Sequence, residues 1–196
     1  MTREAKRRRT TKETQIDLSI DVDGSGQVEV STGLPFFDHM IAQLGKHSRF
    51  DLTVRCEGDI DIDAHHTVED VGIALGEAFA EALGDKQGVR RFASMTVPLD
   101  EAAVEVILDL SGRPFLHYDI EPPGEKILGD PPFDPQLCEE FWRAFVMAAG
   151  ITLHLVLIRG RNTHHIIEAS FKATARALYD AVVVADEVLP STKGVL

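Results

Sequence analysis

The pattern of apolar and polar positions predicts a chain built from two similar halves. In the first half, residues 15–22 and 27–31 alternate around a turn at 23–26, which predicts a β-hairpin. Residues 37–47 have helical spacing and residues 50–56 alternate as a strand. A second helical stretch, residues 67–83, should stop at Gly84. The predicted order is β-β-α-β-α.

The second half repeats this order with one insertion. Residues 91–98 and 102–110 predict a hairpin, residues 136–149 a helix, residues 151–158 a strand and residues 164–189 a long helix. The Pro-rich stretch 121–135 has no counterpart in the first half. We therefore expect an α+β fold of two duplicated β-β-α-β-α units, each a sheet with helices on one face, packed as a pseudo-twofold pair.

Composition narrows the class of protein. The chain has 196 residues, 44% of them hydrophobic, which is enough for a buried core. A net charge of −12 argues against nucleic acid as a partner. Only the start of the chain is basic, and residues 1–8 are expected to be a disordered, solvated tail, with an anchor or address signal as the alternative.

Neither the cysteines nor the apolar runs point to the membrane or the cell exterior. Cys56 and Cys138 give neither a disulfide framework nor zinc-ligand spacing. No apolar run reaches the roughly 18 residues of a membrane helix, and no signal-peptide core follows the basic start. We expect a cytoplasmic protein with no membrane partner.

The pattern His-His-x-x-Glu occurs twice, at 65–69 and 164–168, each time at the start of a predicted helix. On a helix, residues four apart share a face and adjacent residues diverge by about 100°. The first histidine of each pair can therefore act with the glutamate on one metal ion, while the second histidine points elsewhere. This arrangement predicts either two neighbouring ions or ions shared between subunits.

Two further residues lie at similar distances before the histidine pairs, near the start of the first helix of each half. They are His39 and Glu140, so if His39 binds metal, Glu140 should too. Taken alone, His39 could equally be a hydrogen-bonded surface imidazole. The candidate metal ligands are His39, His65, His66, Glu69, Glu140, His164, His165 and Glu168. Imidazole and carboxylate without thiolate favour Mn, Fe(II), Zn or Ni, and four protein ligands per ion with open positions fit octahedral Mn(II).

Several basic side chains could bind an anion near such a metal. Lys172 lies one helical turn beyond Glu168, although a surface lysine in an ion pair is the alternative. Arg91 and Arg113 follow nearby glycines, which permit close approach of an anion. The C-terminal segment 190–194 is similar to a small anion loop, or else a frayed end.

Six segments, at 9–14, 34–40, 63–70, 109–114, 162–169 and 190–194, resemble imidazoleglycerol-phosphate dehydratase. The first histidine-bearing segment reads Leu-Pro-Phe-Phe-Asp-His-Met, and the two metal motifs read Asp-Ala-His-His-Thr-Val-Glu-Asp and Asn-Thr-His-His-Ile-Ile-Glu-Ala. The resemblance runs from about residue 9 to residue 196, and no phosphatase domain is attached. It implies the single-function form of the enzyme, in two repeats at about 9–88 and 89–196, with the fold of the ribosomal protein S5 domain 2-like class.

The resemblance also implies a reaction and its cofactor. Imidazole glycerol phosphate would lose water to give imidazole acetol phosphate in histidine biosynthesis, by way of an imidazolate held by metal. The enzyme would use two Mn²⁺ ions per active site, shared among the subunits of a homo-oligomer of about 24 copies, as the resemblance implies. Relatives usually carry histidine where this chain has Glu140, which we expect to bind metal as a carboxylate.

By position, the remaining roles follow the family. The metal ligands would be His39, His65, His66, Glu69, His164, His165 and Glu168. The substrate-binding residues would be Glu13, His39, Gln43, His47, Arg91, Arg113, Lys172, Ser191 and Lys193. The catalytic carboxylates would be Glu13, which exchanges protons with the substrate, Glu69 and Glu168.

Two other functions use the same ligands. A dinuclear metal-dependent hydrolase acting on a phosphate ester is one. An assembly in which metal only stores or joins subunits is the other, but it leaves Glu13, Arg113 and the basic C-terminal loop without a role.

Overall fold

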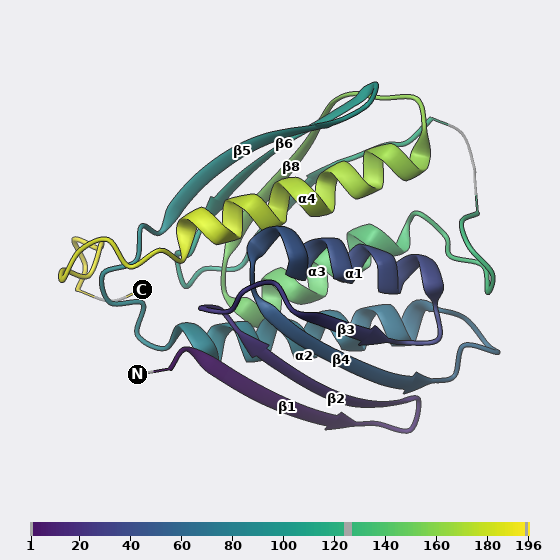
Figure 1. Cartoon of the computed structure of the whole chain (residues 1–196), viewed down its shortest axis with the longest axis horizontal. Helices are drawn as coiled ribbons and strands as arrows, with labels where there is room; N and C mark the ends of the chain where they lie inside the picture. Colours follow the sequence, from purple (N-terminus) through teal and green to yellow (C-terminus); the bar gives the residue numbers. More distant parts are fainter. Residues whose placement is uncertain (1, 124–126, 195) are drawn as a thin grey trace.

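The computed structural model describes residues 2–123, 127–194 and 196, and it places four helices between two four-stranded sheets (Figure 1). The first sheet has the order β1 (Glu4–Thr10), β2 (Thr14–Asp21), β4 (Asp51–Gly58), β3 (Val28–Ser31). The second has the order β5 (Phe92–Leu99), β6 (Ala102–Asp109), β8 (Thr152–Arg159), β7 (Phe115–Asp119). The helices are α1 (Pro35–Ser48), α2 (His65–Leu83), α3 (Leu137–Ala149) and α4 (Thr163–Ala181).

The predicted duplication is confirmed, because both halves have the same order of elements and the same strand order in the sheet. Each half carries one strand more than the sequence pattern predicted, β1 in the first and β7 in the second. The hairpin predicted from residues 15–31 is wrong: β3 pairs in parallel with β4, not with β2. Parallel strands need a crossover, and α1 provides it.

The prediction of a disordered tail at residues 1–8 is wrong from residue 4 onward. These residues form the edge strand β1, which pairs antiparallel with β2. Alternate side chains of the strand face α2, so Arg7 forms ion pairs with Glu77 and Glu81. The guanidinium of Arg9 donates two hydrogen bonds, of 2.8 and 2.9 Å, to Asp70. Arg7 and Arg9 of the basic run are therefore neutralised by acidic residues of a neighbouring helix.

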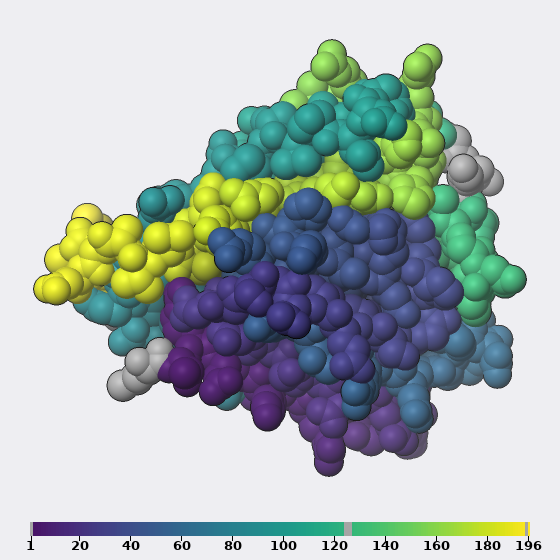
Figure 2. Space-filling model, in the orientation of Figure 1, coloured from purple at the N-terminus to yellow at the C-terminus, as the bar shows by residue number. Residues whose placement is uncertain are grey.

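Helix α4 ends at Ala181, eight residues earlier than the predicted Leu189. A run of valines follows, and Val184 forms an isolated β-bridge with Val89. Branching at Cβ lowers helix propensity and suits extended backbone, which explains the early end. Beyond this point the C-terminal residues extend away from the body of the molecule (Figure 2).

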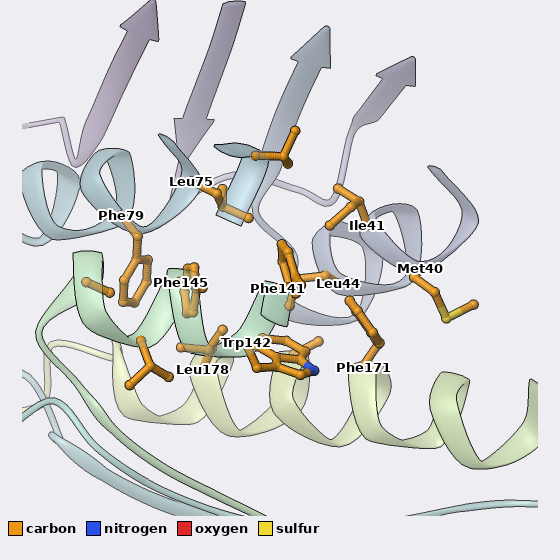
Figure 3. Packing of buried hydrophobic residues seen from close by; sticks show 14 of the residues in the cluster. Met40, Ile41, Leu44, Leu75, Phe79, Phe141, Trp142, Phe145, Phe171 and Leu178 are labelled. Atoms are coloured by element: carbon orange, nitrogen blue, oxygen red, sulfur yellow. The ribbon is translucent and has the colours of Figure 1, made fainter. Parts of the chain in front are cut away.

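The core lies between the helices and joins the two halves. Helix α3 is at its centre: Trp142 packs on Phe171 of α4 with ring centroids 4.8 Å apart, and Phe145 packs on Phe79 of α2 at 5.7 Å (Figure 3). The insertion at 121–135 adds Phe133, which is 1% exposed and stacks on Phe37 of α1. Burying aromatic rings from both halves in one cluster makes the halves a single folding unit.

All four helices begin at the same end of the molecule, where both histidine pairs lie (Figure 1). Helices α2 and α3 run in the same direction and touch closely through two glycines of α2. A Cβ on Gly72 would lie 2.8 Å from the carbonyl oxygen of Phe141, and one on Gly76 would lie 2.5 Å from that of Phe145. None of the helices in the described ranges combines the length and apolar character that a membrane span requires.

We predict that Gly76→Ala destabilises the protein although alanine is the better helix former. The added methyl group meets backbone, and overpacking of this kind costs about 1–3 kcal/mol. Helix propensity returns at most roughly 1 kcal/mol, so the free energy of unfolding should fall. Urea unfolding of the metal-free protein measures the change. Gly45→Ala is the control, because its Cβ meets a side-chain methyl of Val28 that can move, and it should cost less. Equal or higher stability of Gly76→Ala would contradict the packing described here.

Candidate metal centre

One imidazole from the first half meets an imidazole and a carboxylate from the second. His39 lies on α1, and His164 and Glu168 lie one turn apart on α4. Oε2 of Glu168 lies 3.2 Å from Nε2 of His39 and 2.9 Å from Nε2 of His164. Each residue offers one ligand atom within 4.8 Å of the other two. We call these three residues the interhelical cluster.

The carboxylate of this cluster is held in its charged form. Glu168 is 11% exposed, and burial by itself would raise its pKa. Hydrogen bonds from Lys172, His39 and His164 outweigh burial and lower the pKa of Glu168 to about 2. The two imidazoles are about 40% exposed, so the cluster opens to solvent with a permanent negative charge beneath it.

Helix α1 continues the cluster with a row of polar side chains. The amide of Gln43 lies 3.4 Å from Nδ1 of His39 on one side and 3.2 Å from Nε2 of His47 on the other. Burial, followed by the charges of Lys172 and Arg176, lowers the pKa of His47. His39, Gln43 and His47 share one face of α1, which lies opposite the basic side chains of α4.

The second histidine of each pair points away from the first, as the helical spacing predicted. The rings of His164 and His165 stand at 82° to each other, and those of His65 and His66 at 89°. Each second histidine has its own carboxylate partner. Nδ1 of His165 lies 2.7 Å from Glu101, and Nδ1 of His66 lies 3.0 Å from Asp59.

These two hydrogen bonds also shift the pKa of Glu101 and of His66. The hydrogen bond from His165, with backbone N–H groups of Asn162 and Arg161, lowers the pKa of Glu101 to about 2. The hydrogen bond to Asp59 raises the pKa of His66. Asn162 also accepts the backbone N–H groups of His164 and His165, and so caps α4 directly beneath the pair.

The first histidine pair forms a separate, looser group. Oε2 of Glu69 lies 3.9 Å from Nε2 of His65, and Oε1 of Glu13 lies 3.9 Å from Nε2 of His66. Within residues 2–123, 127–194 and 196, no hydrogen bond or ion pair links this group to the interhelical cluster. In the described part of one chain, the interhelical cluster therefore gathers three of the eight predicted ligands.

Glu140 lies in the first turn of α3 and, among the described residues, forms no hydrogen bond or ion pair with an imidazole. Its carboxylate is 3.7 Å from Nε of Arg143, which also pairs with Glu139. The duplication made Glu140 the counterpart of His39. In the described part of the chain it is not brought into a metal-binding group as His39 is.

The predicted anion-binding arginines lie at the far end of α4. The backbone N–H of Arg91 donates to the carbonyl of Ala181, the last residue of the helix. Its side chain binds Asp109 through two hydrogen bonds, of 2.7 and 3.1 Å, and the carbonyl of Pro190 through a third, of 2.6 Å. Arg113 lies 3.8 Å from the same Asp109.

The C-terminal segment meets this arginine pair. Pro190 accepts from Arg91, and the backbone N–H of Lys193 donates to Oγ of Ser191. At 1.5 Å per residue, Ala181 lies roughly 20 Å along the helix from Glu168. The fold therefore brings Arg91, Arg113, Ser191 and Lys193 together, but far from the interhelical cluster of the same chain. Lys172, in contrast, forms an ion pair with Glu168 of that cluster.

Three acidic residues with a part in this geometry were missed by sequence reasoning. Asp59 and Glu101 hold histidines, and Asp109 holds both arginines. Asp59 lies in an acidic loop and Glu101 in a hairpin turn, so neither position has a spacing that marks it. Only the folding of distant segments against each other identifies them.

Comparisons with known proteins find one family with a similar sequence. The sequence profile of the imidazoleglycerol-phosphate dehydratase family matches residues 32–178. A relative of that name from Acidothermus cellulolyticus is 54% identical over 99% of this chain and 93% of its own length. One from Cereibacter sphaeroides is 52% identical over 99% of this chain and all of its own.

Two solved structures with this family name have a similar fold. The crystal structure of the Staphylococcus aureus protein superposes with a TM-score of 0.83 and 40% identity, and covers 93% of this chain and 99% of that one. The crystal structure of the Pyrococcus furiosus protein also has a TM-score of 0.83, with 35% identity over 97% of this chain and 100% of that one.

We predict that Lys172→Met removes a pH-dependent part of the stability of the metal-free protein. The folded pKa of Glu168, about 2, lies below its ordinary 4.5. Ionised Glu168 therefore contributes stability above about pH 4.5 and loses it as the pH falls toward 2. Without Lys172 this pKa should rise, and the contribution of about 1–3 kcal/mol should shrink.

Urea unfolding between pH 7 and pH 3 in the presence of a chelator measures this loss. Lys46→Met is the control, because Lys46 is exposed on α1 and has no contact with Glu168. If the stability of the Lys172→Met variant varies with pH as it does in the unmodified protein, Lys172 does not hold the charge of Glu168.

Proposed function

The chain belongs to the family of imidazoleglycerol-phosphate dehydratases, hydro-lyases of histidine biosynthesis, and on this premise we propose that it dehydrates imidazole glycerol phosphate with Mn²⁺ at sites completed by neighbouring copies of the chain. The observation that carries the metal proposal is the interhelical cluster. Two imidazole nitrogens and one carboxylate oxygen come within 4.8 Å of one another without any thiolate. Such a donor set suits Mn(II), and a charged Glu168 favours a divalent cation.

The other proposed ligands are the side chains that the cluster of one chain lacks. They are His65, His66, Glu69, Glu140 and His165. The side chains of His65, His66 and His165 are partly exposed at the same end of the molecule, and Glu69 and Glu140 are exposed enough to reach a partner. A second copy of the chain would bring them to the cluster, so that each copy shares its ions with neighbours. In a closed homo-oligomer such as a 24-subunit assembly, every copy would both donate ligands to a neighbour and receive them.

The reaction removes a proton from a carbon that has no adjacent carbonyl, so the imidazole ring of the substrate must take up the electrons. A divalent cation beside that ring supplies the positive charge that makes its N–H acidic. The residues of the chain then have two tasks. They hold the substrate at a fixed distance from the proton carriers, and they move the protons.

Glu13 is the proposed proton carrier. It occupies the turn between β1 and β2, is 51% exposed, and lies 3.9 Å from Nε2 of His66. A carboxylate in this position can accept a proton from the substrate carbon and return one after the hydroxyl leaves. Among the described residues its carboxylate forms an ion pair only with His66, at a long 3.9 Å, so the side chain can turn toward the substrate.

The phosphate of the substrate is proposed to lie on Arg91, Arg113, Ser191 and Lys193, with Lys172 nearer the ring. Standard bond lengths give a substrate of roughly 10 Å from ring to phosphate, whereas about 20 Å of helix separates Glu168 from the arginine pair of the same chain. A single substrate cannot span both. The arginines and C-terminal segment of one copy would therefore serve the metal cluster of another.

Membership of this family does not favour the alternative of a phosphate-ester hydrolase. Such an enzyme would release inorganic phosphate, while the dehydratase yields a ketone that retains its phosphate. Incubating the Mn²⁺-loaded protein with imidazole glycerol phosphate and measuring both products distinguishes the two.

We predict that Glu13→Gln reduces turnover by about 10²–10⁴-fold while the manganese content is unchanged, because the amide cannot carry the proton. Glu57→Gln is the matched control, since Glu57 is exposed on the same sheet and lies outside the site, and it should leave turnover unaltered. Manganese is measured by elemental analysis and turnover by formation of the ketone. A full rate in Glu13→Gln would remove this residue from the chemistry.

We also predict complementation between two inactive variants. His164→Ala removes a cluster ligand and Arg113→Ala removes a phosphate ligand, so neither should be active alone. After chelation, mixing and reassembly with Mn²⁺, about a quarter of the sites should combine an intact cluster with an intact arginine from different copies. A mixture with no more activity than the separate variants would show that the two groups act within one chain.

A further inference from the structure

The duplication gives Glu13 a counterpart in the second half. Leu18 of β2 pairs with the fourth residue of β4, and Val106 of β6 pairs with the fourth residue of β8. Counting back by the same number of residues from each leads to Glu13 and to Glu101. Both glutamates lie in the turn that opens the second strand of their sheet, and each is next to the second histidine of its own half.

The two halves differ in what else holds that histidine. In the first half, Asp59 directly follows β4 and takes Nδ1 of His66, so Glu13 is left beside Nε2. In the second half, the residue directly after β8 is Gly160, which has no side chain. Glu101 therefore takes the place of Asp59 as the carboxylate that binds Nδ1 of the second histidine.

Glu101 has both carboxylate oxygens occupied. Oε1 accepts the backbone N–H groups of Arg161, at 3.1 Å, and Asn162, at 2.7 Å. Oε2 accepts from Nδ1 of His165 at 2.7 Å. The side chain is 28% exposed, about half as much as that of Glu13, so the hydrogen bonds fix its orientation.

We propose that Glu101 is a positioning residue that holds His165 in the tautomer with the proton on Nδ1. An ionised carboxylate can only accept, so Nδ1 must donate and Nε2 keeps its lone pair. The inference rests on the proposed function, in which Nε2 of His165 binds a metal ion. Asp59 does the same for His66, so Asp59 and Glu101 have the same role in the two halves. Nε2 of each ring then faces a second carboxylate at 3.9 Å, Glu13 in the first half and Asp100 in the second.

Glu101→Gln tests this assignment, because the replacement has the same shape but only one acceptor oxygen. That oxygen is required by the two backbone N–H groups, so the amide NH₂ should face His165 and donate to Nδ1. The ring would then carry its proton on Nε2, where it blocks the metal. The affinity for Mn²⁺, measured by titration calorimetry on the metal-depleted protein, should fall by about 10–100-fold.

A second readout does not depend on metal or on activity. In the metal-free protein labelled with ¹⁵N-histidine, solid-state NMR distinguishes the two tautomers, and the signal that disappears in His165→Ala belongs to His165. That signal should change from Nδ1–H to Nε2–H in Glu101→Gln. Glu105→Gln, which removes the same charge four residues further along β6, should change neither the tautomer nor the affinity.

The outcomes separate the inference from the proposed function. Unchanged tautomer and affinity in Glu101→Gln, with metal lost in His165→Ala, would overturn the role of Glu101. Metal binding that survives His165→Ala would instead overturn His165 as a ligand, and the tautomer would still decide the role of Glu101. If Glu101→Gln does not fold, Asp59→Asn applies the same test to His66, and an unchanged His66 tautomer there would overturn the assignment.

Discussion

The contact of Glu168 with His39 is the interaction on which the candidate centre depends, because it is made across the two halves of the chain. The aromatic core around Trp142 brings α1 and α4 together, and the parallel directions of the helices place their first turns at one end. Lys172 then keeps the carboxylate charged despite its burial. A cation site built this way requires the folded core, so metal binding should report on tertiary packing as well as on the ligands themselves.

Duplication supplied two copies of each position, and the residues at equivalent positions now make different contacts. His39 joins a cluster, while its counterpart Glu140 faces Arg143. Glu13 is exposed at the end of its hairpin, while its counterpart Glu101 is tied to the loop that precedes α4. The difference follows from one position after the fourth strand of each half, which is an aspartate in one and a glycine in the other. Such exchanges let a symmetric fold hold one imidazole in each half through a carboxylate from a different position.

Much of this fold follows from local sequence pattern, because apolar spacing and the glycine after α2 mark the helix ends to within about two residues, except for the C-terminal end of α4. The divergence of the paired histidines also follows from helix geometry alone. The pattern does not show which residues far apart in the sequence contact each other. The sequence pattern predicts solvated arginines in β1, but in the fold they form ion pairs with Glu77 and Asp70 of α2. The pattern also predicts that β3 is a hairpin strand, whereas it pairs in parallel with β4. The partners of His66 and His165, and the distance between Arg91 and Glu168, depend on tertiary contacts in the same way.

The most direct test of this account is crystallography of the protein with Mn²⁺, using the anomalous scattering of manganese to locate the ions. We expect a peak at bonding distance from Nε2 of His39, Nε2 of His164 and a carboxylate oxygen of Glu168, with further ligands from a neighbouring copy. Manganese bound elsewhere, or no ordered ion at this cluster at saturating Mn²⁺, would contradict it.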